Sequence, residues 1–329
     1  MELIRFEQIQ KSYANEIKII ENLNFTINQG EFITLIGKSG CGKTTILKLI
    51  NGLIKPDTGK IFIKGKEIND WDIIELRRSI GYVIQQIGLF PHMSIEANIA
   101  YVLNIKKESK EVTQNRAKEL IELVGLTGDY LKKYPRELSG GQKQRIGVAR
   151  ALASNPDIIL MDEPFGAVDE ITRRTLQEEI IKLQETLKKT IVFVTHDIEE
   201  AFKLGSRIVL LDSGKIVQQG TREEMLFNPK NQFVKDFFGA KNFTAYLNVT
   251  NIKTAVTPIS KEKKAYYEGM YKDENMHSIK DDSTLMDGIK ALFDYRVDSI
   301  GVEDKSGEII GEFAMKNSSS AILYNENKI

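Results

Sequence analysis

A glycine-rich stretch of the chain has the residue types and spacing of a phosphate-binding loop, G-x-x-x-x-G-K-S/T. It runs Gly37-Lys38-Ser39-Gly40-Cys41-Gly42-Lys43-Thr44. Glycines let the backbone wrap round a phosphate so that its N–H groups point inwards, and a helix beginning near Lys43 adds the positive end of its dipole. In this pattern the lysine reaches the β- and γ-phosphates and the hydroxyl ligates Mg²⁺. We therefore predict that this glycine loop (residues 37–44) binds a nucleoside triphosphate.

Two carboxylates, Asp162 and Glu163, end an apolar run that begins at Ile158. When a phosphate-binding loop is present as well, the first carboxylate after such a strand holds Mg²⁺. The second lies beside the γ-phosphate and can orient or deprotonate a water molecule. The pair therefore predicts Asp162 as a metal ligand and Glu163 as the catalytic base.

Cys41 is the only cysteine and lies inside the glycine loop. A single cysteine excludes an intrachain disulfide and fits a reducing compartment. Two interpretations of Cys41 remain open. It is either a tolerated small residue or a reactive thiol, because a helix N-terminus stabilises a thiolate. If it is reactive, alkylation should block nucleotide binding and ATP should protect against it.

The elements that position these residues alternate between strands and helices. Short apolar runs typical of buried strands occur at 31–36, 157–162 and 190–195. Helical patterns follow the glycine loop at 44–50 and cover about 94–153 and 170–188, and a hairpin is expected over 207–218. This alternation predicts an α/β fold with a largely parallel sheet, and the first 30 residues have the pattern of additional strands.

Length and charge limit the classes of protein that fit. The chain has 329 residues, enough for about two domains, with 46 Lys and Arg against 46 Asp and Glu. The balanced charge does not favour nucleic acid or an acidic lipid surface as a partner. The N-terminus lacks the pattern of a signal peptide, and no apolar run approaches the about 18 residues that span a bilayer. If the protein works at a membrane, we expect partner chains to span it.

A further stretch, Leu138-Ser139-Gly140-Gly141-Gln142, lies between the glycine loop and the two carboxylates. Together the three motifs resemble those of the ATP-binding cassette (ABC) ATPases, in which this signature segment (residues 138–142) has the sequence LSGGQ. The resemblance covers about residues 1–240. It implies an α/β P-loop nucleotidase fold with a mainly parallel sheet core, an antiparallel β subdomain and a helical subdomain that carries the signature segment.

The resemblance also implies roles for residues outside the glycine loop. Tyr13 resembles the aromatic residue that stacks on adenine, and His196 resembles the switch histidine on the γ-phosphate. Gln85 resembles the glutamine that links the γ-phosphate and Mg²⁺ to the membrane partner, with Gln86 as the alternative. Asp169 resembles the aspartate of a loop that crosses a dimer interface. The predicted catalytic residues are Glu163, His196 and Lys43; the predicted metal ligands are Thr44, Gln85 and Asp162; and the predicted nucleotide contacts are Tyr13, Gly37, Lys38, Ser39, Gly40, Cys41, Gly42, Lys43, Thr44, Thr45, Gln85, Ser139, Gly140, Gly141, Gln142 and Asp169.

The same family resemblance implies a mechanism shared between two copies. Each ATP lies between the glycine loop of one copy and Ser139 and Gly141 of the other, so a homodimer binds two ATP molecules. ATP closes the dimer and hydrolysis opens it, and integral-membrane permease subunits respond to the motion. The implied location is the cytoplasmic face of the cell membrane, with a substrate-binding protein as an indirect partner and no nucleic acid.

The transported solute is indicated by local resemblance. Residues 81–99 are similar to the corresponding segment of importers for glycine betaine, carnitine or choline. An importer of amino acids, polyamines or sugars is the alternative. A cassette ATPase of DNA repair or translation and a regulatory module without catalysis are further alternatives. The single copy of each motif and the presence of Lys43, Asp162, Glu163 and His196 argue against these two.

The remaining residues, 241–329, predict a small α+β accessory domain. A helix over 283–297, a strand at 299–302, a turn and a strand at 308–313 resemble one CBS unit. Such units normally pair, and Val249–Thr254 resembles the first strand of a degenerate second unit. One hypothesis is regulation by ionic strength or by an adenine-type nucleotide. The other is a stabilising or dimerising appendage.

Overall fold

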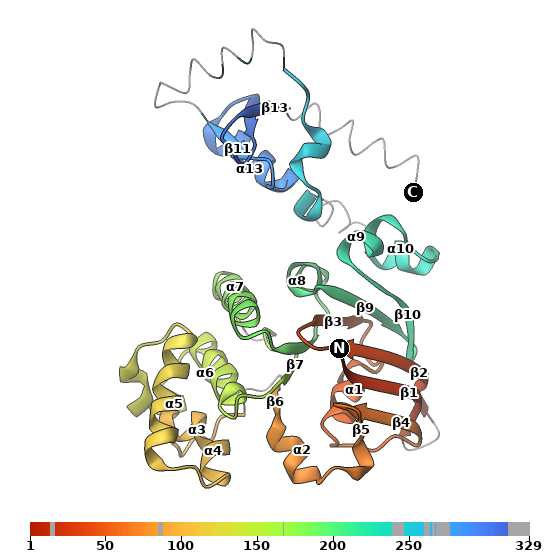
Figure 1. The fold of residues 1–329 in the computed structure, drawn as a ribbon, viewed down its shortest axis with the longest axis vertical. Helices are drawn as coiled ribbons and strands as arrows, with labels where there is room; N and C mark the ends of the chain where they lie inside the picture. The colour runs from red at the N-terminus through yellow and green to blue at the C-terminus, as the bar shows by residue number, and fades with distance from the viewer. Residues whose placement is uncertain are drawn as a thin grey trace. The chain divides into compact units, whose positions relative to one another are not determined.

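The computed structural model describes residues 1–13, 17–84, 88–166, 168–238, 247–259, 264, 267 and 277–314. The chain forms two compact units, Met1–Met225 and Leu226–Ile329 (Figure 1). The predicted domain boundary at residue 240 lies outside the described residues and stays a prediction. No helix in the described part of the chain is both long and apolar enough to cross a membrane.

The first unit is built on a six-stranded sheet with the order β10-β9-β3-β8-β7-β6. Its strands are β3 (Phe32–Gly37), β6 (Ile80–Val83), β7 (Ile158–Asp162), β8 (Thr190–Val194), β9 (Arg207–Asp212) and β10 (Lys215–Gly220). All neighbouring pairs are parallel except the hairpin β9–β10. The predicted parallel core and the predicted hairpin are therefore confirmed.

Alternate side chains of this sheet enter different hydrophobic clusters. Ile158 and Leu160 of β7 pack in a cluster with α1 (Lys43–Ile50) and with the N-terminal strands. Ile159 and Met161 pack in a second cluster formed largely by helices. Since successive strand residues point to opposite faces, the sheet is buried on both sides. This double burial explains the continuous apolar runs in the sequence.

An antiparallel sheet packs against the first of these clusters. It has the order β2-β1-β4-β5, with β1 (Glu2–Tyr13), β2 (Ile17–Asn28), β4 (Thr58–Ile63) and β5 (Lys66–Glu67). Helix α2 (Ile73–Ser79) follows these strands and leads into β6. The predicted antiparallel β subdomain is confirmed. In its first hairpin, Tyr13 at the end of β1 pairs with Ile17 at the start of β2.

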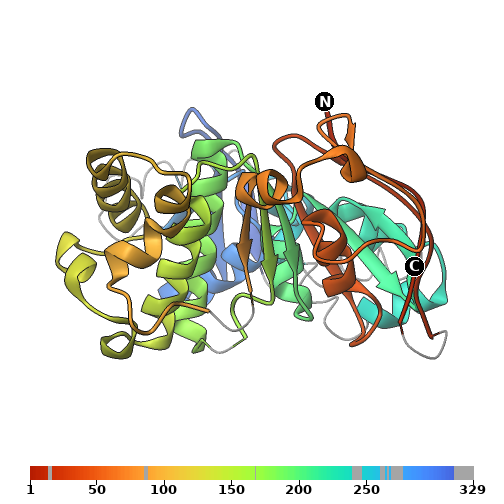
Figure 2. The same ribbon diagram turned by 90° about the horizontal axis from the view of Figure 1, so that it is seen from below.

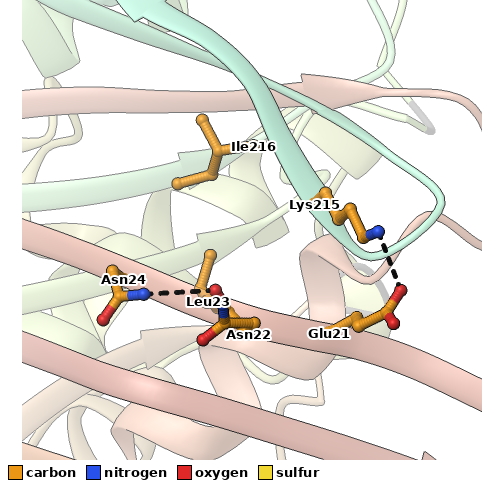
Figure 3. A pocket seen from close by; sticks show the side chains of 6 residues that line it. All are labelled: Glu21, Asn22, Leu23, Asn24, Lys215 and Ile216. Carbon is orange, nitrogen blue, oxygen red and sulfur yellow. Dashed lines mark hydrogen bonds and ion pairs between the residues drawn. The ribbon is translucent and has the colours of Figure 1, made fainter.

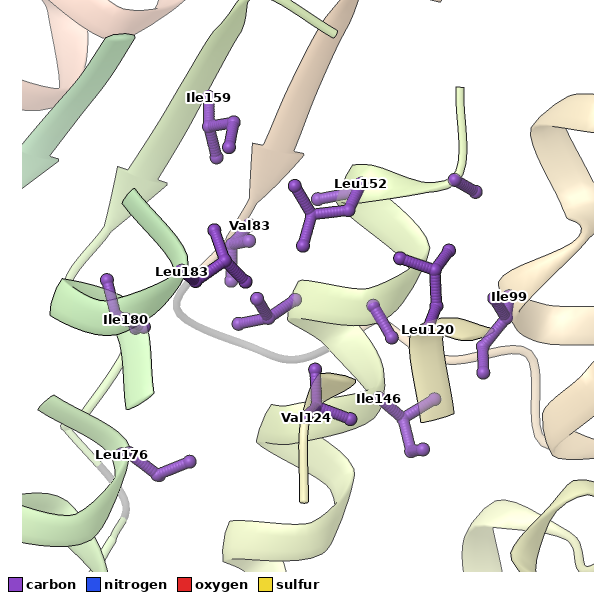
Figure 4. Packing of buried hydrophobic residues seen from close by; sticks show 14 of the residues in the cluster. Val83, Ile99, Leu120, Val124, Ile146, Leu152, Ile159, Leu176, Ile180 and Leu183 are labelled. Atoms are coloured by element: carbon purple, nitrogen blue, oxygen red, sulfur yellow. The ribbon is translucent and has the colours of Figure 1, made fainter. Parts of the chain in front are cut away.

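Helices on the other side of the parallel sheet carry the signature segment. They are α3 (Ile95–Ile99), α4 (Tyr101–Ile105), α5 (Lys110–Leu123) and α6 (Gly140–Leu152), and they form a group beside α7 (Glu170–Leu187) in Figures 1 and 2. Leu152 of α6 lies between Leu120 of α5 and Leu183 of α7 in Figure 4, and Ile146 of α6 belongs to the same cluster. This packing fixes α6 against its neighbours, and it confirms the predicted helical subdomain.

The second unit contains a small three-stranded sheet. β11 (Ser278–Lys280) pairs in parallel with β12 (Ser299–Glu303), and helix α13 (Leu285–Tyr295) connects the two strands. β13 (Ile309–Ala314) pairs antiparallel with β12. The predicted helix-strand-turn-strand order is confirmed. Phe293, which recurs at helical spacing with Leu285 and Leu292, is instead 68% exposed. The unit also includes α10 (Gln232–Phe238), and α9 (Arg222–Phe227) spans the division between units.

The predicted strand at Val249–Thr254 is wrong. Residues Ile252–Ala255 form a short 3₁₀ helix, and the strand that precedes α13 is β11. The local cause is Asn251, whose side chain accepts a hydrogen bond from the Lys253 N–H at 2.8 Å. This turn competes with strand pairing for the backbone.

Candidate functional site

Four separate chain segments surround one cavity of about 410 Å³ in the first unit. They are the β1–β2 hairpin, the glycine loop with the start of α1, the residue after β7 and the turn after β8. The lining residues are Tyr13, Ile19, Ser39, Gly40, Gly42, Lys43, Thr44, Thr45, Glu163 and His196. Nine of these ten were predicted from the sequence, and Ile19 was not.

The glycine loop needs glycine at its two ends. At Gly37 a Cβ atom would lie 2.1 Å from the Leu211 carbonyl oxygen, so the loop packs directly on β9. Gly42 caps α1 with a φ of 106°. A Cβ there would lie 2.6 Å from Ile20 Cδ1 and 2.9 Å from the Ile19 carbonyl oxygen. A side chain at either position would collide with these neighbours, so the loop conformation requires glycine at both positions.

Lys43 is only 6% exposed, although its side chain is charged. Its ammonium group donates hydrogen bonds to the carbonyl oxygens of Gly37 at 2.7 Å and Lys38 at 3.0 Å. These acceptors compensate for the loss of water around a buried cation. The loop backbone therefore holds the Lys43 ammonium group in place, and because Lys43 lines the cavity, its charge can attract an anion there.

Cys41 does not have the environment of an activated thiol. Its side chain is 5% exposed, and burial raises the pKa of the Cys41 thiol despite the opposing effect of Lys43. The raised pKa is opposite in direction to the shift that a thiolate stabilised by the helix N-terminus requires. Of the two interpretations, the structure favours a tolerated small residue that packs inside the loop.

Thr44 and Asp162 meet although 118 residues separate them. The Thr44 hydroxyl donates to Asp162 Oδ1 at 3.0 Å, because the start of α1 lies beside the carboxyl end of β7. Burial is the main cause that raises the pKa of the Asp162 carboxyl. A hydroxyl and a carboxylate side by side are oxygen donors of the kind that Mg²⁺ prefers, and a cation would offset the cost of burying the charge. These residues therefore fit a magnesium ion.

Tyr82 on β6 supports the same carboxylate. Burial, followed by the negative charge of Asp162, raises the pKa of Tyr82 to about 12, and the two side chains are hydrogen-bonded. The phenol therefore stays protonated and donates to Asp162. Tyr82 was missed from the sequence, because only the folded sheet pairs β6 with β7 and brings Tyr82 to Asp162.

Glu163 and His196 face each other across the ends of β7 and β8. His196 Nδ1 lies 3.3 Å from Glu163 Oε2, with side chains that are 69% and 25% exposed. The Glu163 N–H donates to the Val194 carbonyl oxygen at 3.0 Å, and Glu163 has a φ of 44°. This left-handed conformation is costly for a residue with a Cβ, and it turns the carboxylate towards the cavity instead of continuing the strand.

The signature segment lies outside the cavity. Ser139 is the N-cap of α6, and its side chain and that of Gln142 each accept a hydrogen bond from the other's backbone N–H. The Gln142 amide also donates to the Tyr130 hydroxyl at 3.0 Å. Ser139 and Gly140 are exposed, and Gly141 is buried. No residue of 138–142 is among the described residues that line the cavity, so one chain does not bring the two sequence motifs together.

Other predicted contacts have separate positions. Asp169 is exposed just before α7, and its carbonyl oxygen accepts a hydrogen bond from the Arg173 N–H at 2.8 Å. Gln85 and its alternative Gln86 lie outside the described residues. Gly37, Lys38 and Cys41 belong to the glycine loop but do not line the cavity.

A second cavity, of about 440 Å³, lies between β2 and β10 (Figure 3). Lys215 forms an ion pair with Glu21 at 3.0 Å, and the Asn24 amide donates to the Asn22 carbonyl oxygen at 3.3 Å. These polar groups are satisfied by one another, and no sequence motif contributes to the cavity. The chemistry is therefore concentrated at the glycine loop.

Comparison with known proteins assigns this arrangement to a family. The ABC transporter family matches residues 20–166. Over 312 residues the chain is 48% identical to the glycine betaine/carnitine/choline transport ATP-binding protein OpuCA of Bacillus subtilis, a match that covers 94% of this chain and 77% of that protein. The chain belongs to the ABC transporter ATP-binding proteins. This ABC protein is therefore an ATPase that uses ATP with Mg²⁺.

Two further relatives extend this result. The ABC protein is 57% identical over 237 residues to the choline transport ATP-binding protein OpuBA of Bacillus subtilis, covering 72% of this chain and 62% of that protein. It also resembles a solved dimeric ATP-binding cassette in a post-hydrolysis state bound to ADP and Pi. That likeness has a TM-score of 0.61 and 37% identity, and covers 67% of this chain and 98% of the other. ABC ATPases of this kind form dimers and act with membrane permease subunits.

Proposed function

We propose that this ABC protein is the ATP-hydrolysing subunit of an importer for quaternary ammonium osmoprotectants: glycine betaine, carnitine or choline. ATP hydrolysis is supported by one observation: Glu163 and His196 line the same cavity as Lys43 and the rest of the glycine loop. The solute class rests on the relatives, whose names specify these compounds. An importer of another solute, such as amino acids, polyamines or sugars, is the alternative that the experiment below separates.

The cavity residues have distinct roles in this proposal. The glycine loop N–H groups and Lys43 bind the phosphates, and Tyr13, an exposed residue of the cavity lining, stacks on the adenine. Thr44 and Asp162 hold Mg²⁺, which neutralises phosphate charge when bound. Glu163 accepts a proton from the water that attacks the γ-phosphate, and His196, 3.3 Å from that carboxylate, contacts the γ-phosphate and keeps Glu163 oriented.

The exposed signature segment serves the second copy in a homodimer. Ser139 and Gly140 are exposed at the N-terminus of α6, where backbone N–H groups and the helix dipole favour an anion. In the proposed dimer they complete the partner's nucleotide site together with Gly141 and Gln142, and Asp169 lies at the interface. Each site then needs two chains, so ATP binding closes the dimer and hydrolysis releases it.

The complete transporter has further parts in this proposal. Gln85 couples the nucleotide to permease subunits at the cytoplasmic face of the membrane, and a substrate-binding protein delivers the solute. The second unit has one of two roles in this proposal: a CBS-like regulatory domain that responds to ionic strength or to a nucleotide, or a stabilising or dimerising appendage. Its described part contains one βαβ-type unit followed by an antiparallel strand, which equally suits a stabilising or dimerising appendage.

The test is solute-dependent ATP hydrolysis by the reconstituted transporter. The chain is assembled in liposomes with its permease and substrate-binding protein, and phosphate release is measured with each solute in turn. We expect stimulation by glycine betaine, carnitine or choline, and none in the matched complex carrying Glu163→Gln. Stimulation by only a polyamine, an amino acid or a sugar would overturn the solute class. No hydrolysis with any solute would overturn the catalytic part.

A further inference from the structure

A buried carboxylate outside the cavity holds the turn that carries His196. Glu200 on α8 (Ile198–Leu204) is 7% exposed, and its Oε2 accepts a hydrogen bond from the Thr195 hydroxyl at 2.6 Å. The same hydroxyl oxygen accepts from the Asp197 N–H at 2.9 Å. Thr195 and Asp197 flank His196 in sequence, so this chain of hydrogen bonds fixes the backbone on both sides of the histidine.

The other oxygen of Glu200 faces Arg173 of α7. Arg173 Nε lies 3.9 Å from Glu200 Oε1, close enough for charge attraction but too far for a hydrogen bond. This Nε atom is buried and has no hydrogen-bond partner in the described part of the chain. A buried donor beside a buried carboxylate is an arrangement that a small movement would convert into a charge-assisted hydrogen bond.

Arg173 in turn holds the segment that follows Glu163. Its guanidinium donates through Nη2 to the Val168 carbonyl oxygen at 3.1 Å, and its backbone N–H donates to the Asp169 carbonyl oxygen at 2.8 Å. This segment is itself joined to Glu163, because the Gly166 N–H donates to the Glu163 carbonyl oxygen at 3.3 Å. The contacts thus run from the turn that carries His196, through the side chains of Thr195, Glu200 and Arg173, to the Val168 carbonyl oxygen in the segment that follows Glu163.

We propose that Glu200 and Arg173 are a positioning pair that keeps the His196 turn in register with the Glu163–Asp169 segment. The inference deepens the proposed function and rests on the roles given there to Glu163 and His196. Neither partner reaches the cavity, so the pair acts through the turn and the segment that it joins. In a dimer in which Asp169 lies at the interface, a shift of that segment would move the histidine and the base together.

The charges around Glu200 agree with such a link. Burial raises the pKa of the Glu200 carboxyl, and Asp197 raises it further, whereas the Thr195 hydrogen bond and the charges of Arg173 and His196 lower it. A carboxylate in this position is costly without a cation nearby. Arg173 therefore offsets the cost of burying the Glu200 charge. An uncharged residue in place of Glu200 would avoid that cost, so packing alone does not account for the pair.

The competing explanation is that Glu200 only anchors α8 to the sheet. A structural anchor affects folding and ATP binding together, whereas a positioning pair affects kcat with little change in affinity. The test therefore compares Glu200→Gln, Arg173→Lys and the double variant in the full chain. Glu200→Gln keeps an acceptor for Thr195 but removes the charge that faces Arg173. Arg173→Lys keeps the charge but removes the planar group that spans Glu200 and Val168.

For each variant, ATP turnover, the dissociation constant for ATP and the melting temperature are measured. We expect kcat to fall about tenfold in each single variant and to fall no further in the double variant, because both changes break one link. The dissociation constant for ATP should stay within about twofold of the wild-type value. Matched controls are the exposed neighbours, Glu199→Gln and Arg174→Lys, which should leave all three quantities unchanged.

Two outcomes would overturn the proposal that Glu200 and Arg173 are a positioning pair. One is wild-type kcat in both single variants. The other is additive losses of kcat, affinity and melting temperature, as for a simple anchor. The proposed function fails separately, if the wild-type chain hydrolyses no ATP or if Glu163→Gln retains turnover. Should Glu200→Gln fail to fold, Arg173→Lys alone decides the inference, because the Arg173 side chain is 26% exposed and the substitution keeps a positive charge there.

Discussion

The two units differ in what their polar groups face. In the first unit, Glu163, His196 and Lys43 come from separate segments and line one cavity. In the second unit, the buried Asp281 pairs with Lys253 at 2.7 Å, and the buried Glu312 accepts a hydrogen bond from Tyr267 at 3.2 Å. Polar groups that converge on a cavity provide chemistry, whereas groups that satisfy one another provide stability. The comparison predicts that the residues required for basal ATP turnover lie in the first unit.

The largest effect should come from removing the base. We expect Glu163→Gln to lower ATP turnover by about 10² to 10⁴-fold, because the amide cannot accept the proton. ATP binding should persist, and the dimer should become more stable, since bound ATP is not consumed. Turnover is measured as phosphate release and dimerisation by sedimentation. Glu185→Gln on the exposed face of α7 is the matched control. Retained turnover would remove Glu163 from its proposed role.

A smaller effect should follow from adding one methyl group to the glycine loop. Gly42→Ala places a Cβ 2.6 Å from Ile20 Cδ1 on a residue with a φ of 106°. We expect affinity for ATP to fall about tenfold, since strain of this kind costs on the order of 1–3 kcal/mol. Fluorescent-nucleotide titration measures the change. Gly128→Ala, where a Cβ meets nothing within 4 Å and φ is not in the left-handed region, should bind ATP normally.

A core substitution in the second unit tests the other side of the comparison. Phe313 is fully buried there, and Phe313→Ala should destabilise that unit by about 3–5 kcal/mol. Turnover by the isolated full chain should change less than about twofold, because the substitution leaves the cavity residues in place. Calorimetry and phosphate release measure the two effects. Ile310→Ala, on the same strand but 39% exposed, is the control. A large loss of turnover would show that the units are coupled.

The smallest effect concerns the thiol of Cys41. Because burial raises its pKa, native Cys41 should react with iodoacetamide more slowly than the same residue in urea. Between about pH 7 and pH 10, its labelling rate should rise later than that of a free cysteine. Mass spectrometry follows the modification. A native rate equal to that of the unfolded chain would restore the hypothesis of a reactive thiol.

Sequence patterns singled out residues of this cavity where local chemistry demands particular residue types. The glycine loop could be singled out because a phosphate site needs glycines at fixed spacing. Asp162 and Glu163 could be singled out because they come at the end of a recognisable buried strand, and the structure places Glu163 in the cavity and Asp162 against Thr44. Buried strands were recognised because the sheet is covered on both faces. Glu200 was missed because its run of charged residues looks like an exposed helix start, and only folding places Thr195 and Arg173 around it.

In the second unit, prediction failed for a related reason. The residues of Val249–Thr254 have strand-forming side chains, but the Asn251 turn decided the backbone. Phe293 follows the helical spacing of Leu285 and Leu292, which are buried, yet it is 68% exposed. Among the described residues, α13 packs against β12, β13 and the 3₁₀ helix Ile252–Ala255, and spacing alone does not show which side of a helix such neighbours cover. In a small unit, the number of covering elements limits which side chains can be buried.

The position of β3 in its sheet has a consequence for biosynthesis. This strand carries the glycine loop, but its two neighbours, β8 and β9, are made more than 150 residues later. During synthesis, β3 and the glycine loop therefore leave the ribosome before the strands that pair with β3 have been made. Leu211, on which Gly37 packs, is among the last residues needed. The loop therefore takes its final shape, and can bind nucleotide as in the folded unit, only after β8 and β9 have been made.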